Sequence, residues 1–407
     1  MNNAQKIPIT AALTIILLFW IPGILSAQDF QELLKEKRTK TDYGFYNVID
    51  VKYHHGSFLK NSHTLDNIMD NPYDSYDVRV GFQSTGFKQK YDQLYGFPVY
   101  GVGFFHVFFK GGELGAPQAL YLFMRSPVIR GRKFSWNWEL AAGLSYGFYK
   151  YDPAVNPEQQ VIGSKHNVYF NVATGVSYAL NQRFDLTLDF DLTHFSNGST
   201  RTPNIGVNLA GLAMGARYSF NPIRNYTKVV DSTYRPTTKP VFIKKKIEKY
   251  IRHSDIIVFG SIGGKTTTTQ IYDGPTYFVS SLSMDYAWAY SHLGRVGVGL
   301  DGFYESALRD FPVRIPDASF TDLSYLGWHI SHYLRMYRFS LVTQVGFYIS
   351  DHVSHKGNMY FQVGGNYHIN DRLFARAALK TRNGAVADFI EWGIGYRFPF
   401  AYGKKRD

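Results

Sequence analysis

A histidine and a serine stand two residues apart near the end of an alternating segment in this 407-residue chain. They are His194 and Ser196, at the end of the segment 184–196. A serine hydroxyl is a poor nucleophile alone and needs an adjacent base, which an imidazole supplies near neutral pH. The pair therefore indicates nucleophilic cleavage of an ester. The alternative is that both are interfacial polar residues without chemistry.

A third group must orient the imidazole in such a site. The next segment, 205–220, carries Asn208. If the two segments form a hairpin with 194 opposite 208, both side chains lie on one side of the sheet, with Cβ atoms about 5 Å apart. The loop between the segments contains amides and glycines whose N–H groups could stabilise an oxyanion. These substrate-binding candidates are Asn197, Gly198, Asn204 and Gly206.

The elements that carry these residues have a period of two, which predicts β-strands. In 184–196 the apolar face alternates with an Asp/Thr face, and 134–148 and 166–180 follow the same pattern. Such strands are longer than the usual five or six residues of globular sheets, and aromatic residues cluster at their ends. Continuing the parity places His194 and Ser196 on the apolar face. One apolar face consists of Phe184, Leu186, Leu188, Phe190 and Leu192.

Composition excludes several classes of protein. No cysteine is present, so disulfides and Cys-ligated metals are excluded. Mean hydropathy is −0.22, and after the N-terminus no apolar run reaches about 18 residues, so a helical membrane bundle is excluded. The net charge of +12 is concentrated in 221–252, which gives nucleic-acid binding little support. The expected fold is an all-β, antiparallel outer-membrane β-barrel, closed because lipid offers no hydrogen-bond partners.

Each half of the chain contains about eight candidate strands, so we predict two tandem eight-stranded barrels. The alternative is one barrel of 14–16 strands. The sequence of Leu180–Phe184 is similar to that of Ile369–Leu373, which favours an origin of the two halves by duplication. The predicted organisation is a signal peptide at 1–27, an N-terminal arm at 28–42, a barrel half carrying the site at 43–220, a basic periplasmic linker at 221–252 and a second barrel half at 253–407.

The segment from His194 to Gly198, followed by Pro203-Asn204-x-Gly206, resembles the lipid A 3-O-deacylase (PagL-type) family. The resemblance extends over roughly 95–220. It implies an outer-membrane barrel that removes an ester-linked acyl chain from lipid A without a cofactor or metal. It also implies that His194 is the base and Ser196 the nucleophile, with Asn204, and Asn197 with it, at the oxyanion. The expected partners are lipid A or lipopolysaccharide and the outer membrane of a Gram-negative bacterium, with no nucleic acid and with a homodimer left open.

The chain departs from the family at one position, because Asn208 stands where the family has an acidic residue. An asparagine can orient the imidazole but cannot stabilise the imidazolium by charge. Glu391 is a candidate substitute, although its parity places it inside a wall. The second half has Thr381 where the repeat would need a histidine, so we predict no site there. Two rival functions stay open: a non-catalytic pore or structural barrel, and a phospholipase on the same scaffold.

Two pairs of histidines have a spacing that does not suit a metal site. His54 and His55 are adjacent, and therefore face opposite sides of a strand. His329 and His332 are three residues apart, which also splits them across a strand. Neither spacing brings two imidazoles to one metal ion.

Overall fold

The structure, a computed structural model, describes residues 46–401 except 60–70, 87–89, 132, 182, 221–241, 243, 248–249, 251, 268–273, 313 and 384–385. The predicted signal peptide, the arm and most of the linker lie outside these residues. Strands dominate the described chain, and three short 3₁₀ helices interrupt them: η3 (Lys90–Tyr95), η4 (Ser306–Arg309) and η5 (Asp351–Lys356). Among the described residues, no helix has the length and apolar character needed to cross a bilayer.

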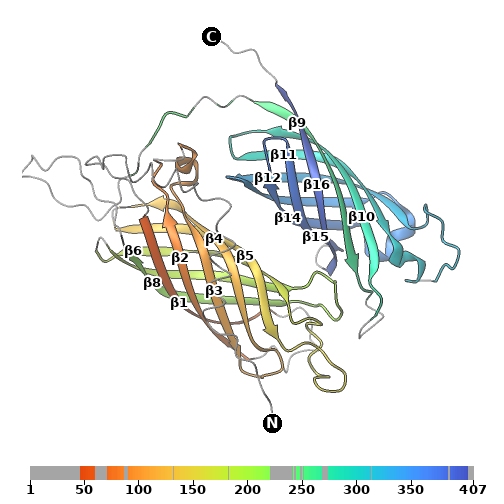
Figure 1. Cartoon of the computed structure of the whole chain (residues 1–407), viewed down its shortest axis with the longest axis horizontal. Coiled ribbons are helices and arrows are strands. Elements are labelled where there is room, and N and C mark those ends of the chain that lie inside the picture. Colours follow the sequence, from red (N-terminus) through yellow and green to blue (C-terminus); the bar gives the residue numbers. More distant parts are fainter. Residues whose placement is uncertain are drawn as a thin grey trace, which may run out of the picture. The chain divides into compact units, whose positions relative to one another are not determined.

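Eight consecutive antiparallel strands form the first barrel (Figure 1). Each strand pairs with the next, and β1 pairs with β8, so the sheet has no free edge. The strands are β1 (Tyr46–Phe58), β2 (Tyr73–Gln83), β3 (Val99–Phe109), β4 (Gly115–Arg130), β5 (Phe134–Phe148), β6 (Asn167–Ala179), β7 (Phe184–Ser196) and β8 (Val207–Ser219).

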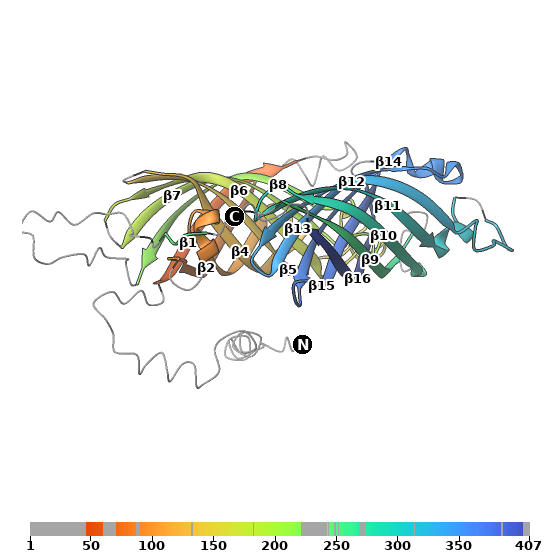
Figure 2. The ribbon, with the colours of Figure 1, turned by 90° about the horizontal axis from the view of Figure 1, so that it is seen from above.

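The next eight strands form a second closed barrel, in which β16 pairs back to β9. Neighbouring strands of its wall, such as β9, β10 and β11, run side by side in Figure 2. The strands are β9 (His253–Lys265), β10 (Tyr277–Ala289), β11 (Gly294–Glu305), β12 (Ser324–Met336), β13 (Phe339–Tyr348), β14 (Met359–His368), β15 (Leu373–Arg382) and β16 (Val386–Ala401). Two tandem eight-stranded barrels are thus confirmed, and a single larger barrel is excluded.

The predicted alternation governs which residues face outward. In β7, Leu186, Leu188 and Phe190 are exposed on the outer wall, whereas Asp189 and Asp191 are buried inside. The pattern fails at the end of β5, where Phe148 is buried although its parity places it outside. Gly147, just before it, has φ +89°, a left-handed conformation that turns the next side chain into the core.

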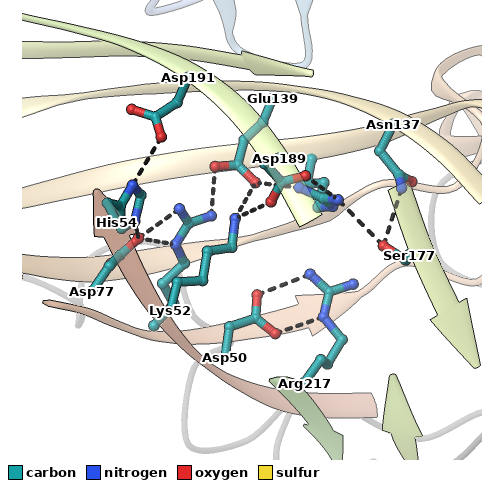
Figure 3. Close-up of polar contacts among 12 residues, drawn as sticks. Asp50, Lys52, His54, Asp77, Asn137, Glu139, Ser177, Asp189, Asp191 and Arg217 are labelled. Carbon is teal, nitrogen blue, oxygen red and sulfur yellow. Dashed lines mark hydrogen bonds and ion pairs between the residues drawn. The ribbon is translucent and has the colours of Figure 1, made fainter. Parts of the chain in front are cut away.

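The interior of the first barrel is filled by a network of ion pairs. Figure 3 shows carboxylates and cations that meet across the lumen from strands that are not neighbours. Lys52 of β1 donates to Asp189 of β7 at 2.8 Å, and Arg79 of β2 donates to Glu139 of β5 at 2.5 Å. Burial of these charges is tolerated because each has an oppositely charged partner. Beside this network, the rings of Phe105, Tyr121, Tyr169 and Phe195 pack together.

The interior of the second barrel also contains a network of buried ion pairs. Three lysines, Lys265, Lys356 and Lys380, share the carboxylates of Glu305 and Asp388. Lys356 lies in η5, between two strands, and reaches inward to Glu305 at 2.6 Å. Both lumens therefore contain side chains that are bonded to one another where an open channel would hold water.

Candidate active site

The β7–β8 hairpin positions the predicted site. Its register pairs His194 with Asn208, as the sequence predicts. The outward parity of β7 runs through Leu192 to His194 and Ser196, because Thr193 and Phe195 are buried inside. The three polar side chains therefore stand together on the outer wall, at the rim where β7 ends.

A continuous line of hydrogen bonds joins the three residues. Nδ1 of His194 lies 2.6 Å from Oδ1 of Asn208, and Nε2 of His194 lies 2.9 Å from Oγ of Ser196. The amide oxygen of an asparagine only accepts hydrogen bonds, so Nδ1 must carry the proton. Nε2 is then the acceptor, and it faces the serine hydroxyl. This is the imidazole tautomer that a general base for serine requires.

The serine is sheltered although it is on the outer wall. Ser196 is 4% exposed, whereas Leu192, four residues earlier on the same face, is 42% exposed. The loop that follows Ser196, 197–206, is joined to the loop 149–166 by a bridge between Ile162 and Asn204 and by the N–H of Ile205, which donates to the carbonyl of Val161 at 2.9 Å. Shelter from water strengthens electrostatic interactions at a reacting centre.

The loop asparagines divide into two kinds. The Asn197 side chain is held in place: its Nδ2 donates to Oγ of Ser164 at 2.9 Å, while its backbone N–H donates to Oδ1 of Asn204 at 3.0 Å. Asn204 is fixed through that oxygen, and its Nδ2 is buried without a hydrogen-bond partner among the described residues. A buried, unsatisfied N–H donor of this kind is chemically suited to a group that develops negative charge.

Sequence reasoning did not identify Ser164 as part of this arrangement. Its hydroxyl oxygen is also within hydrogen-bond distance of the His166 carbonyl and of Oδ1 of Asn167, at 3.0 and 2.9 Å, so the Asn197 amide is anchored to the start of β6. Ser164 lies within the stretch 95–220 that resembles the family, but its residue type and position do not single it out. No periodicity marks a contact between two loops, so nothing in the sequence pattern pointed to it.

Glycine is required at Gly206 by two separate constraints. Its φ is +81°, which disfavours any residue with a Cβ. A Cβ there would also lie 3.1 Å from Cε1 of His194 and 3.6 Å from Cβ of Ser196. Gly198 likewise has a positive φ, +60°. Both glycines thus shape the loop, and Gly206 leaves room for the imidazole.

Two residues considered from the sequence are placed elsewhere. Glu391 is enclosed in the second barrel, where its Oε2 accepts hydrogen bonds from Ser261 at 2.8 Å and Ser281 at 2.6 Å. It is therefore no substitute for the missing acid beside His194. Thr381 is opposite Ala387 in the β15–β16 pair, and its hydroxyl contacts the backbone of Phe361.

Comparisons with known proteins find similar solved structures and matching family models. Solved structures similar to the chain include "Crystal structure of the outer membrane enzyme PagL", at 14% identity, covering 41% of this chain and 97% of that one with a TM-score of 0.31. Another is "Crystal structure of Neisserial surface protein A (NspA)", at 14% identity, covering 43% of this chain and 97% of that one with a TM-score of 0.30. No curated protein matches the chain.

Two family models match, one in each barrel. Residues 74–217 match Lipid A 3-O-deacylase (PagL), and residues 252–400 match the C-terminal domain of acyloxyacyl hydrolase. Together they span well over half of the chain, and each match falls on one of the two barrels. The chain therefore belongs to the lipid A 3-O-deacylase (PagL) family and is a barrel of the Gram-negative outer membrane.

Proposed function

We propose that this protein hydrolyses an acyl ester of lipid A, with Ser196 as nucleophile and His194 as general base and then general acid. The observation that carries the proposal is the hydrogen-bonded line from Asn208 through His194 to Ser196, on the outer wall of the barrel. An outward-facing serine meets acyl chains rather than a soluble substrate. An ester lipid of the outer leaflet is the substrate class that fits this position.

The reaction follows from the tautomer. Oγ of Ser196 attacks the ester carbonyl carbon while its proton passes to Nε2 of His194. The tetrahedral intermediate collapses, the sugar hydroxyl leaves with that proton, and an acyl-enzyme forms. A water molecule then attacks the acyl-enzyme and gives a proton to Nε2 of His194. His194 returns that proton to Oγ of Ser196 as the fatty acid leaves. Asn208 keeps Nδ1 protonated throughout.

Two groups are proposed to stabilise the oxyanion. Nδ2 of Asn204 is buried and unpaired among the described residues, and the Asn197 contact holds its amide in place. The backbone N–H of Gly198 is the second donor, because that of Gly206 already donates to the Val161 carbonyl at 3.4 Å. Removing one such donor from a serine hydrolase costs about 10²- to 10³-fold in kcat.

The filled lumen argues against the rival pore. Charged side chains of the first barrel bond across its interior from β1 to β7 and from β2 to β5 (Figure 3). An ion that entered would have to separate these buried pairs, each of which is costly to break. A role on the outer wall leaves this network undisturbed.

Mass spectrometry of lipid A tests the proposal. Lipid A is isolated from cells producing the full chain as wild type, Ser196→Ala or His194→Asn, with Ser280→Ala as the matched control. Ser280 alternates with exposed Phe278 and Leu282 and has no histidine two residues before it. We expect wild type and the control to remove an acyl chain and both site variants to lose at least 10³-fold in rate. Identical lipid A in all four strains overturns the proposal, and loss of a phospholipid acyl chain instead identifies a phospholipase.

A further inference from the structure

The His-x-Ser spacing occurs a second time on the same wall. In β1, His55 and Ser57 stand two residues apart and both are exposed on the outer face, while His54 and Phe58 are buried inside. The adjacent histidines thus face opposite ways, as predicted. His54 belongs to the lumen, where its Nδ1 lies 2.9 Å from Asp191. His55 has no part in that network.

His55 has the carboxylate that His194 lacks. In the β1–β2 pair it is opposite Asp74, and its Nδ1 lies 2.8 Å from Oδ1 of that residue. The same oxygen accepts a hydrogen bond from the hydroxyl of Tyr53, which fixes the carboxylate. With Nδ1 directed to Asp74, Nε2 is the nitrogen that can take a serine proton.

The two arrangements are equivalent in topology. In each, the histidine and serine lie at the end of a strand, and the orienting residue lies directly opposite the histidine on the next strand of a hairpin. β8 pairs with both β7 and β1, so β7 and β1 run in the same direction and end at the same rim. Neighbouring strands are about 4.8 Å apart, and His55 is opposite Leu212 of β8 whereas His194 is opposite Asn208, four residues away. The two sites are therefore roughly 16 Å from each other across β8.

We propose that Ser57, His55 and Asp74 form a second site for hydrolysis of a carboxylic ester in an outer-leaflet lipid. Ser57 attacks the carbonyl carbon, its proton passes to Nε2 of His55 and then to the departing alcohol, and water hydrolyses the acyl-enzyme. Among the described residues, the side chains of Ser57 and His55 form no hydrogen bond with each other. Hydrogen bonds between catalytic groups often shorten only when the substrate is bound.

The proposal does not rest on the role of Ser196. The geometric parallel supplies the nucleophile, base and acid, and the outward position supplies the substrate class, an ester of an amphiphile. Lipid A and a glycerophospholipid share that chemistry. The side chain of His55 is 57% exposed and that of Asp74 33%, so a lipid has direct access to both.

The test uses the full-length protein in mixed micelles of lipid A and a phosphatidylethanolamine whose acyl chains differ in length. Released fatty acids and lysolipids are measured by mass spectrometry for wild type, Ser196→Ala, Ser57→Ala and the double variant. We expect Ser196→Ala to retain release at least tenfold above the double variant. In the Ser196→Ala background, Asp74→Asn should reduce that release to the level of the double variant. The identity of the fatty acid shows which lipid is cut.

The remaining outcomes separate the two proposals. If Ser57→Ala matches wild type while Ser196→Ala matches the double variant, the second site is overturned and the first stands. If Ser57→Ala abolishes release while Ser196→Ala does not, the second site stands and the first falls. Covalent labelling of the folded protein with a fluorophosphonate, followed by peptide mapping, provides an independent reading: no label on Ser57 in Ser196→Ala protein overturns the inference. Heat-modified migration on gels checks that each variant is folded.

Discussion

Oδ1 of Asn208 lies 2.6 Å from Nδ1 of His194, the position at which a serine triad holds a carboxylate. The amide selects the imidazole tautomer that catalysis needs, but it carries no charge to stabilise the imidazolium formed when Ser196 is deprotonated. A carboxylate at this position would both orient the imidazole and stabilise its positive charge. Asn208 does only the first.

The first prediction follows from that separation. Asn208→Asp keeps the shape of the side chain and adds the charge, so kcat for ester cleavage should rise by about tenfold or more. Asn208→Leu, which removes the acceptor, should lower kcat instead. Rates are compared on a lipid ester in detergent micelles. An unchanged rate for Asn208→Asp would show that charge at this position is not what limits the reaction.

The second prediction concerns the buried amide of Asn204. Asn204→Ala removes the unpaired Nδ2 and should lower kcat by about 10²- to 10³-fold with little change in KM, because the donor acts on the oxyanion and not on the bound ester. Ser164→Ala removes only the anchor of Asn197 and should cost less, since Asn204 itself is retained. A rise in KM with an unchanged kcat for Asn204→Ala would instead indicate a role in substrate binding.

The third prediction separates backbone strain from crowding at Gly206. A Gly206→Ala side chain meets Cε1 of His194 at 3.1 Å, and the resulting displacement of the imidazole should lower activity by about 10²-fold. Gly112→Ala is the matched control: its φ of +82° is nearly the same, but no atom lies within 4 Å of the added Cβ. Loss of activity in both variants would assign the effect to strain alone.

The fourth prediction addresses the ion cluster of the second barrel. Asp388→Asn leaves three lysines with one carboxylate, Glu305, and should lower the free energy of unfolding by about 3–5 kcal/mol. Lys356→Met leaves two lysines for two carboxylates and should cost about 1 kcal/mol or less. Urea unfolding in detergent, followed by tryptophan fluorescence, measures both. A larger loss for Lys356→Met than for Asp388→Asn contradicts the charge count.

The same lysine predicts a pH dependence. Burial lowers the pKa of Lys356 to about 8, and the positive charges of Lys265 and Lys380 act in the same direction. Between about pH 8 and the ordinary lysine value near 10.4, the unfolded chain binds more protons than the folded one. This group should therefore make the free energy of unfolding increase as pH rises through that window. The increase should be absent in Lys356→Met, and a decrease specific to the wild type would refute the assignment.

The sequence predicted the barrels and the core of the site because both depend on a period of two. Alternation identified sixteen strands. The same parity placed His194 and Ser196 on the outer face, with His194 opposite Asn208. It failed at Phe148, where Gly147 adopts a positive φ that alternation does not encode. The Ser164–Asn197 contact joins two loops, and loop residues show no alternation from which such a contact could be predicted.

The second His-x-Ser was present in the sequence and passed over for a different reason. In the sequence His54 and His55 are adjacent, so the pattern draws attention to the pair as metal ligands and not to His55 with Ser57. Once the strand separates them, His55 is grouped with Ser57 on one face and with Asp74 across the hairpin. The second His-x-Ser becomes apparent when the end of β1 is compared with the end of β7, because both strands carry a histidine and a serine two residues apart on the outer face.

A reactive serine on the outside of a wall also determines how an enzyme meets its substrate. Because Ser196 lies on the outer wall, the lipid would arrive by lateral diffusion within its own leaflet. Turnover would then follow the mole fraction of lipid A at the surface rather than its concentration in bulk. Diluting the substrate with inert amphiphile at constant total lipid A should slow the reaction, a kinetic behaviour that an enzyme fed from solution does not share.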